Sequence, residues 1–91
     1  MKYTYTAVLN FSEGGDIYAK VPDLPGCIAT GTSIYEAVNM ITDAALTWLA
    51  IAEDEGADIP KATNKSEIPA SPCTVRIVLN LDTDSYRNVE E

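Results

Sequence analysis

Two closely spaced prolines, Pro22 and Pro25, constrain the fold of this chain more than any other feature. Each proline ring fixes its own φ at about −65° and pushes the preceding residue toward extended backbone geometry. Gly26 and Cys27 follow directly. The sequence therefore predicts a stiff bend over Val21–Cys27, and a helix cannot run through it.

Alternating side chains on both sides of this bend predict strands. Apolar and polar residues alternate from Lys2 to Phe11, which is typical of a strand buried on one face. A turn with two glycines follows, and Asp16 to Val21 is expected to return as the second strand of an antiparallel hairpin. A short third strand is expected from Cys27 to Thr30, ending at a glycine turn at Gly31.

A long amphipathic helix is predicted after Gly31. Ser33 and Glu36 have the spacing of a capping box, in which each side chain accepts a hydrogen bond from the backbone N–H of the other residue. Gly56 is the expected C-terminal cap. The apolar stripe that should face the sheet consists of Ile34, Ala37, Val38, Ile41, Ala45, Trp48, Leu49 and Ala52.

The rest of the chain is expected to supply one more strand. Residues 59–72 are irregular and proline-containing, so they predict a surface loop with one helical turn near Ser66. Alternation returns from Cys73 to Leu81. The fold class is α+β: a small antiparallel sheet in the order β-β-β-α-β with one long helix packed on one face. We expect one domain over residues 1–81 and an acidic tail or linker over residues 82–91.

The charge balance limits the possible partners. Fourteen acidic residues against six basic ones give a net charge of −8, which repels nucleic-acid phosphates and anionic membrane surfaces. The same charge favours association with a basic protein. A chain of 91 residues has a small core, so we also expect a homodimer or tetramer. Without an apolar run of roughly 20 residues, a cytoplasmic protein is expected.

Residues suited to catalysis are scarce. The chain has no histidine, the commonest general base near neutral pH. Cys27 and Cys73 lack metal-site spacing, so both are expected to be reduced, small core residues. No cofactor or metal is expected, and the chain is not expected to be an enzyme. The alternative is a cluster of Asp16, Asp23 and Glu36 that holds a divalent cation, although each of these residues also suits a structural role.

An ordered series of motifs resembles the HicB family of antitoxins over nearly the whole chain. It contains a tyrosine-rich first strand, a glycine hairpin and the Ile59-Pro60 pair after the helix. The central motif residues are Pro22, Asp23, Leu24, Pro25, Gly26, Cys27, Thr30, Gly31, Ser33, Glu36 and Ala37.

This resemblance implies a partial RNase H-like fold without catalysis. It also implies a partner, the small basic toxin HicA, which cleaves mRNA and whose active surface the antitoxin covers. Candidate toxin-binding residues lie around the second strand and the bend: Asp16, Tyr18, Lys20 and Asp23. Many family members carry a C-terminal module that binds operator DNA. That module is absent from these residues, so direct nucleic-acid binding is not expected. Two alternatives remain: a divalent-metal-dependent RNase H-like nuclease, and an orphan regulatory or oligomerisation domain.

Overall fold

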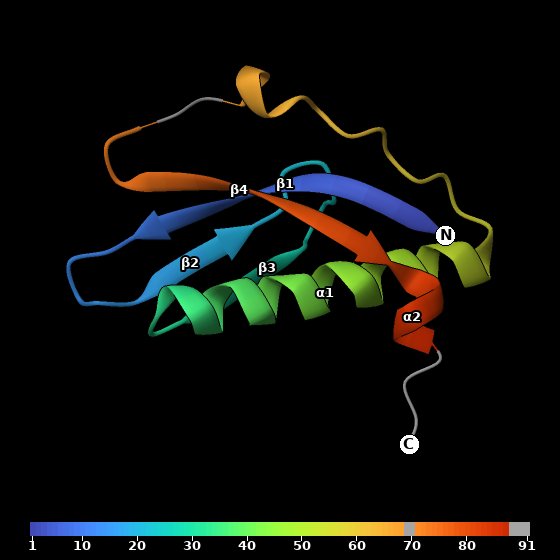
Figure 1. Ribbon diagram of the computed structural model, residues 1–91, viewed down its shortest axis with the longest axis horizontal. Coiled ribbons are helices and arrows are strands. Elements are labelled where there is room, and N and C mark those ends of the chain that lie inside the picture. The colour runs from blue at the N-terminus through green and yellow to red at the C-terminus, as the bar shows by residue number, and fades with distance from the viewer. Residues whose placement is uncertain (69–70, 88–91) are drawn as a thin grey trace.

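A four-stranded antiparallel sheet with one long helix on one face forms the centre of the molecule (Figure 1). The computed structural model describes residues 1–68 and 71–87. The strand order is β3-β2-β1-β4, so β3 and β4 form the two edges of the sheet. The predicted α+β class and element order are confirmed. The elements are β1 (Lys2–Phe11), β2 (Ile17–Lys20), β3 (Ile28–Gly31), α1 (Ile34–Glu55), a 3₁₀ helix (Lys65–Glu67), β4 (Thr74–Asp82) and α2 (Thr83–Arg87).

The register of the sheet makes β1 its central strand. β4 pairs with β1 along its whole length, from Lys2 opposite Asp82 to Asn10 opposite Thr74. β2 pairs only with the second half of β1, and β3 pairs with β2. The sheet therefore has one short edge at β3 and one long edge at β4.

The face of the sheet under α1 contains the hydrophobic core. Alternate residues of the strands point toward the helix, and they pack against the apolar residues that recur about every 3.6 positions along α1, as predicted. The buried residues of this core are Tyr5, Ala7, Leu9, Ile17, Ala19, Val21, Leu24, Cys27, Ala37, Ile41, Ala45, Leu49, Leu79 and Leu81. Ile34 differs from the predicted stripe because its side chain is 53% exposed. A helical side chain covers the turn before its own Cα, and Ile34 is the first residue of α1.

The caps of α1 follow the prediction in part. The Ser33 hydroxyl accepts a hydrogen bond from the Glu36 N–H at 3.1 Å, as expected. The Glu36 carboxylate, however, accepts from the N–H and the hydroxyl of Thr32 at 2.7 and 2.9 Å, so the reciprocal half of the capping box is wrong. Two donors on Thr32 replace the single N–H of Ser33, and they lower the pKa of Glu36. Gly56 ends the helix with φ 67°, as predicted.

Gly31 has a different role from the one the sequence suggested. It is the last residue of β3 and its φ is not positive, so the turn does not require glycine there. A Cβ at this position would lie 2.6 Å from the backbone nitrogen of Ala37. Gly31 is therefore needed because β3 and the first turn of α1 approach each other closely.

The segment 57–68 crosses the face of the sheet opposite α1 (Figure 1). The predicted helical turn near Ser66 is confirmed as the 3₁₀ helix. Ile68 is 7% exposed, and the Arg76 guanidinium donates to the carbonyls of Lys65 and Ile68 at 2.9 and 3.0 Å. Thr6 and Val8 are buried although they point away from α1. This segment thus covers part of the second face.

The chain beyond Leu81 differs from the expected linker. Asp82 still belongs to β4, and residues 83–87 form the short helix α2, which contacts α1. The Thr83 hydroxyl donates to the Glu53 carboxylate at 2.9 Å, and the hydroxyls of Thr47 and Tyr86 lie 2.8 Å apart. The end of the expected tail, residues 88–91, lies outside the described residues. In the part of the chain that the structure describes, no helix is both long and apolar enough to cross a membrane.

Candidate partner-binding surface

The proline bend folds as two consecutive turns. The Leu24 N–H donates to the Val21 carbonyl and the Cys27 N–H to the Leu24 carbonyl, both at 3.0 Å. The Val21 N–H closes the base of the bend on the Cys27 carbonyl at 3.1 Å. Leu24 is buried at the centre, and Gly26 has φ 79°, which glycine adopts readily. The predicted stiff bend is confirmed.

Contacts on two sides hold this bend in place. The Asp23 carboxylate accepts hydrogen bonds from the N–H and the hydroxyl of Thr63 at 2.8 and 2.7 Å. The indole N–H of Trp48 donates to the Pro25 carbonyl at 2.9 Å. Asp23 therefore connects the bend to the segment 57–68, and Trp48 connects it to α1. β2 and β3 are held on a rigid base.

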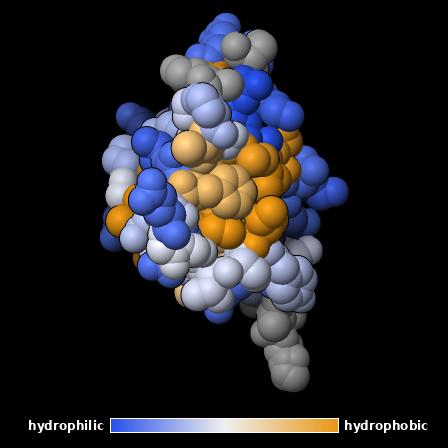
Figure 2. Space-filling model, turned by 90° about the vertical axis from the view of Figure 1, so that its left-hand side faces the viewer, coloured by the Kyte–Doolittle hydropathy of each residue, from blue (hydrophilic) through white to orange (hydrophobic). Residues whose placement is uncertain are grey.

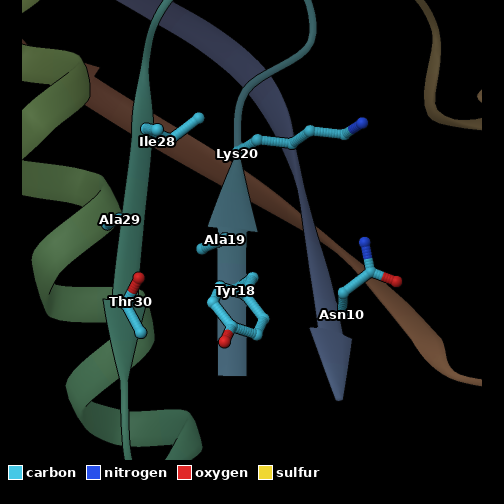
Figure 3. A pocket seen from close by; sticks show the side chains of 7 residues that line it. All are labelled: Asn10, Tyr18, Ala19, Lys20, Ile28, Ala29 and Thr30. Carbon is cyan, nitrogen blue, oxygen red and sulfur yellow. The ribbon is translucent and has the colours of Figure 1, made fainter. Parts of the chain in front are cut away.

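The exposed side of β2 and β3 forms a shallow hollow, shown in Figure 3. Tyr18 and Ile28, which both line it, are 50% and 70% exposed. The residues that line it are Asn10, Tyr18, Ala19, Lys20, Ile28, Ala29 and Thr30. Its volume is about 160 Å³. Ligand pockets usually measure roughly 300–1,000 Å³, so a flat protein surface is a better fit than a small molecule.

Unpaired backbone groups adjoin the hollow at the edge of β3. The hydrogen bond from the Val21 N–H to the Cys27 carbonyl fixes which residues bond across the β2–β3 ladder. By the alternation of an antiparallel ladder, Ile28 and Thr30 direct their N–H and C=O groups away from β2. No further strand lies beside β3 in the described sheet. Exposed apolar side chains and free backbone groups thus occur together.

The four residues singled out from the sequence divide into two groups. Tyr18 and Lys20 line the same hollow. Asp16 is exposed at the hairpin, where its carbonyl accepts hydrogen bonds from Ser12 at 3.1 and 2.8 Å. Asp23 faces Thr63. Sequence reasoning missed Asn10, Ile28 and Thr30, which the register places beside Tyr18 and Lys20.

The carboxylates proposed for a metal site do not come together. Asp23 binds Thr63 and Glu36 binds Thr32, while Asp16 lies at the hairpin. Among the described residues, no group of three or more acidic, cysteine or histidine side chains could hold a metal ion.

The two cysteines have different surroundings. Cys27 is buried as expected, and burial raises the pKa of its thiol. Cys73 is exposed, so its expected core position is wrong. It directly precedes β4, and α1 packs more against β3 and β2 than against that strand.

Acidic side chains dominate the described surface. Exposed carboxylates occur on the hairpin, on α1, just after its C-terminal end, on the 3₁₀ helix and on α2. They are Glu13, Asp16, Glu36, Asp43, Asp54, Glu55, Asp58, Glu67 and Asp84. Among the side chains that the structure describes, the exposed basic ones are Lys2, Lys20, Lys61 and Lys65. Such a surface attracts a cationic protein and repels a phosphate backbone.

The fold and this surface define a small α+β domain with a free sheet face and free edges that suit protein contacts. Solved structures share the fold. The N-terminal domain of the antitoxin HicB from Burkholderia pseudomallei is 20% identical, with a TM-score of 0.76 over 88% of this chain and 99% of that one. A toxin–antitoxin complex from Streptococcus pneumoniae is 15% identical, with a TM-score of 0.78 over 94% and 73%. A complex of HicA3 and HicB3 is 15% identical, with a TM-score of 0.69 over 88% and 99%.

The family follows from the sequence comparison. The model of the HicB-like antitoxins of bacterial toxin–antitoxin systems matches residues 5–89. The chain therefore belongs to the HicB-like antitoxin family. A search of curated proteins finds no match.

Proposed function

We propose that this chain is an antitoxin that binds a small, basic, mRNA-cleaving toxin of the HicA type and neutralises it by covering its active surface. The observation that carries the proposal is the family match over residues 5–89. The complex of HicA3 and HicB3 is a solved structure with the same fold, which supports a toxin as the partner. Because such a toxin acts on mRNA, the chain is proposed to work in the cytoplasm.

Charge supports a basic protein as the partner. A net charge of −8 speeds encounter with a cationic surface and disfavours competing nucleic acid. The toxin's RNA-binding surface must itself attract phosphates, so it offers the complementary charge. In this proposal the chain acts by occupying that surface, and it neither cleaves RNA nor binds nucleic acid directly.

The exposed side of β2 and β3 is the proposed contact. Tyr18 and Ile28 offer apolar area beside the free backbone groups of Ile28 and Thr30. Tyrosine is enriched among residues that dominate binding energy, because it buries a large ring and keeps a hydroxyl for hydrogen bonding. Thr63 and Trp48 hold the bend in place, so this surface is already ordered before binding. Binding therefore costs less conformational entropy.

Co-expression with the small basic protein encoded beside this chain tests the proposal. The chain should restore growth that the toxin arrests, and the two proteins should co-purify. Tyr18→Ala should lose rescue, whereas Tyr35→Ala should keep it; Tyr35 is a matched control because it is 79% exposed on α1, away from the hollow. Growth arrest that the wild-type chain leaves unchanged would contradict the antitoxin role and favour an orphan domain.

The nuclease alternative is tested separately. Purified chain is incubated with RNA and Mg²⁺, with Asp23→Asn as the comparison. The proposed function expects no cleavage by either protein. Cleavage that requires Asp23 would replace the binding role with a catalytic one.

A further inference from the structure

The outer edge of β4 is long and unpaired. The Phe11 N–H donates to the Cys73 carbonyl at 2.9 Å, and this bond continues the β1–β4 register. By ladder alternation, the odd-numbered residues of β4 bond to β1, and Arg76, Val78 and Asn80 direct their N–H and C=O groups outward. Within the described residues no other strand lies beyond β4. This edge resembles a template for one more strand.

Apolar side chains accompany these free groups. Val75 and Val78 are each 44% exposed, on opposite faces of β4. α1 contacts β3 and β2 more than β4, so the beginning of β4 lacks a cover on the helix side. Figure 2 shows apolar side chains gathered on the end of the molecule where β4 and α1 begin. Natural proteins protect a long edge with proline, charged side chains or a bulge; residues 75–81 contain no proline and no bulge, and Arg76 is their single charged residue.

We propose that the β4 edge is the interface through which two copies of this chain pair, with their β4 strands antiparallel across a two-fold axis at Leu79. The two four-stranded sheets then become one continuous sheet. A two-fold axis makes the contact self-complementary and closed, so it does not propagate into fibres. We choose a second copy as the partner because the outward N–H and C=O groups of one β4 strand match those of another β4 strand that runs antiparallel to it.

Charge selects the register. Outward groups belong to even-numbered residues, so even residues must face even residues across the axis. An axis at Leu79 places Arg76 opposite Asp82 of the second copy, twice per dimer, and Val78 opposite Asn80. An axis at Val78 would place Arg76 opposite Asn80, so Arg76 would have no carboxylate across the axis, and Asp82 would have only the N-terminal ammonium of its own chain, at 4.0 Å. Because each copy has a net charge of −8, the register that pairs a cation with a carboxylate is favoured.

The existing contacts of these charges allow the pairing. The Arg76 guanidinium uses one nitrogen, Nη1, for the carbonyls of Lys65 and Ile68, and arginine has five N–H donors. The Asp82 carboxylate accepts from Asp84 and Ser85, lies 4.0 Å from the N-terminal ammonium of Met1 and is half-buried. Each side chain thus keeps capacity for one further partner.

Sedimentation of the purified full chain over a concentration series tests the interface. We expect wild-type protein to form dimers. Val78→Glu should weaken the dimer by roughly tenfold or more, because two cross-strand pairs per dimer are lost and two like charges are added. Ile28→Glu is the matched control, since it makes the same change on the opposite edge and should leave the dimer intact. A wild-type chain that stays monomeric, or equal weakening by both variants, would overturn the interface.

Further variants separate loss of the dimer from misfolding and check the register. Val78→Pro removes an outward N–H that the monomer does not use, so it should dissociate the dimer while circular dichroism stays unchanged. Arg76→Glu and Asp82→Arg should each weaken the dimer, and the double variant should restore it. Failure of the double variant to recover, with all proteins folded, would overturn the Leu79 axis. Val78→Glu should still rescue growth from the toxin, so failure of this inference is distinguishable from failure of the proposed function.

Discussion

The two faces of the sheet differ in what covers them. Under α1, Leu9, Ile41 and Leu49 are completely buried. On the opposite face the segment 57–68 covers Thr6 and Val8, while Tyr18 and Ile28 on β2 and β3 remain at least half exposed. The first face therefore supplies most of the stability of the domain, whereas the second is open to a partner. Substitutions of similar size on the two faces should have very different effects on folding.

The largest difference is expected for isoleucine truncation. Ile41→Ala removes a side chain that is completely buried against the sheet and should lower the free energy of unfolding by about 2–5 kcal/mol. Ile28→Ala, on the open face, should change it by less than about 0.5 kcal/mol. Urea denaturation followed by circular dichroism measures both. Equal losses would show that the open face is a folding surface as well.

A smaller loss is expected where β3 meets α1. Gly31→Ala places a Cβ 2.6 Å from the backbone nitrogen of Ala37, so the helix start has to move, at a cost of roughly 1–3 kcal/mol. Gly14→Ala is a matched control because a Cβ at that position would have no neighbour within 4 Å and its φ is not positive. Thermal unfolding of the two variants compares them. A Gly31→Ala protein as stable as the control would contradict the close approach.

The next effect concerns the bend beneath the open face. Asp23→Ala leaves the N–H of Thr63 without its carboxylate acceptor and should lower the free energy of unfolding by about 1–3 kcal/mol, measured by urea denaturation. Asp16→Ala should change it little, since the Asp16 side chain is exposed. If Asp23→Ala kept full stability and lost only toxin binding, Asp23 would be a contact residue and not a support for the bend.

The smallest effect is a dependence on alkaline pH. Burial and the hydrogen bond to Glu53 raise the pKa of Tyr3 from 10.0 to about 12. The folded state therefore holds the phenol proton more tightly than the unfolded state. The stabilisation is fully present below pH 10 and is lost as the pH rises toward about 12. Tyr3→Phe should flatten the fall in stability over this interval, followed by urea denaturation at each pH. An unchanged profile would show that Tyr3 does not contribute to it.

The sequence predicted the features that depend on local pattern. Alternation identified the strands, Ser33 and Gly56 marked the ends of the helix, and the two prolines identified the bend. Each of these signals lies within a few neighbouring residues. For that reason the α+β class, and the place of Tyr18 and Lys20 on the second strand, could be predicted from the sequence alone.

Features that depend on distant contacts were not accessible. α2 has only five residues, and its hydrogen bonds to Thr47 and Glu53 come from a helix more than 25 residues earlier in the chain. Alternation placed Cys73 on the helix side but could not show that α1 packs more against β3 and β2 than against β4. The hollow required the β2–β3 register, which brings Ile28 and Thr30 beside Tyr18. Pairing Val21 with Cys27 across the bend would have predicted this register from the sequence, because it places even-numbered residues of the two strands on the same face.

Calorimetric titration of the purified toxin tests the account most directly, with wild-type chain, Tyr18→Ala and Tyr35→Ala compared at equal ionic strength. We predict that Tyr18→Ala binds at least about tenfold more weakly than wild type while its free energy of unfolding is unchanged, and that Tyr35→Ala binds like wild type. Wild-type affinity for Tyr18→Ala, together with weakened binding by Tyr35→Ala, would place the partner on α1 and contradict the account.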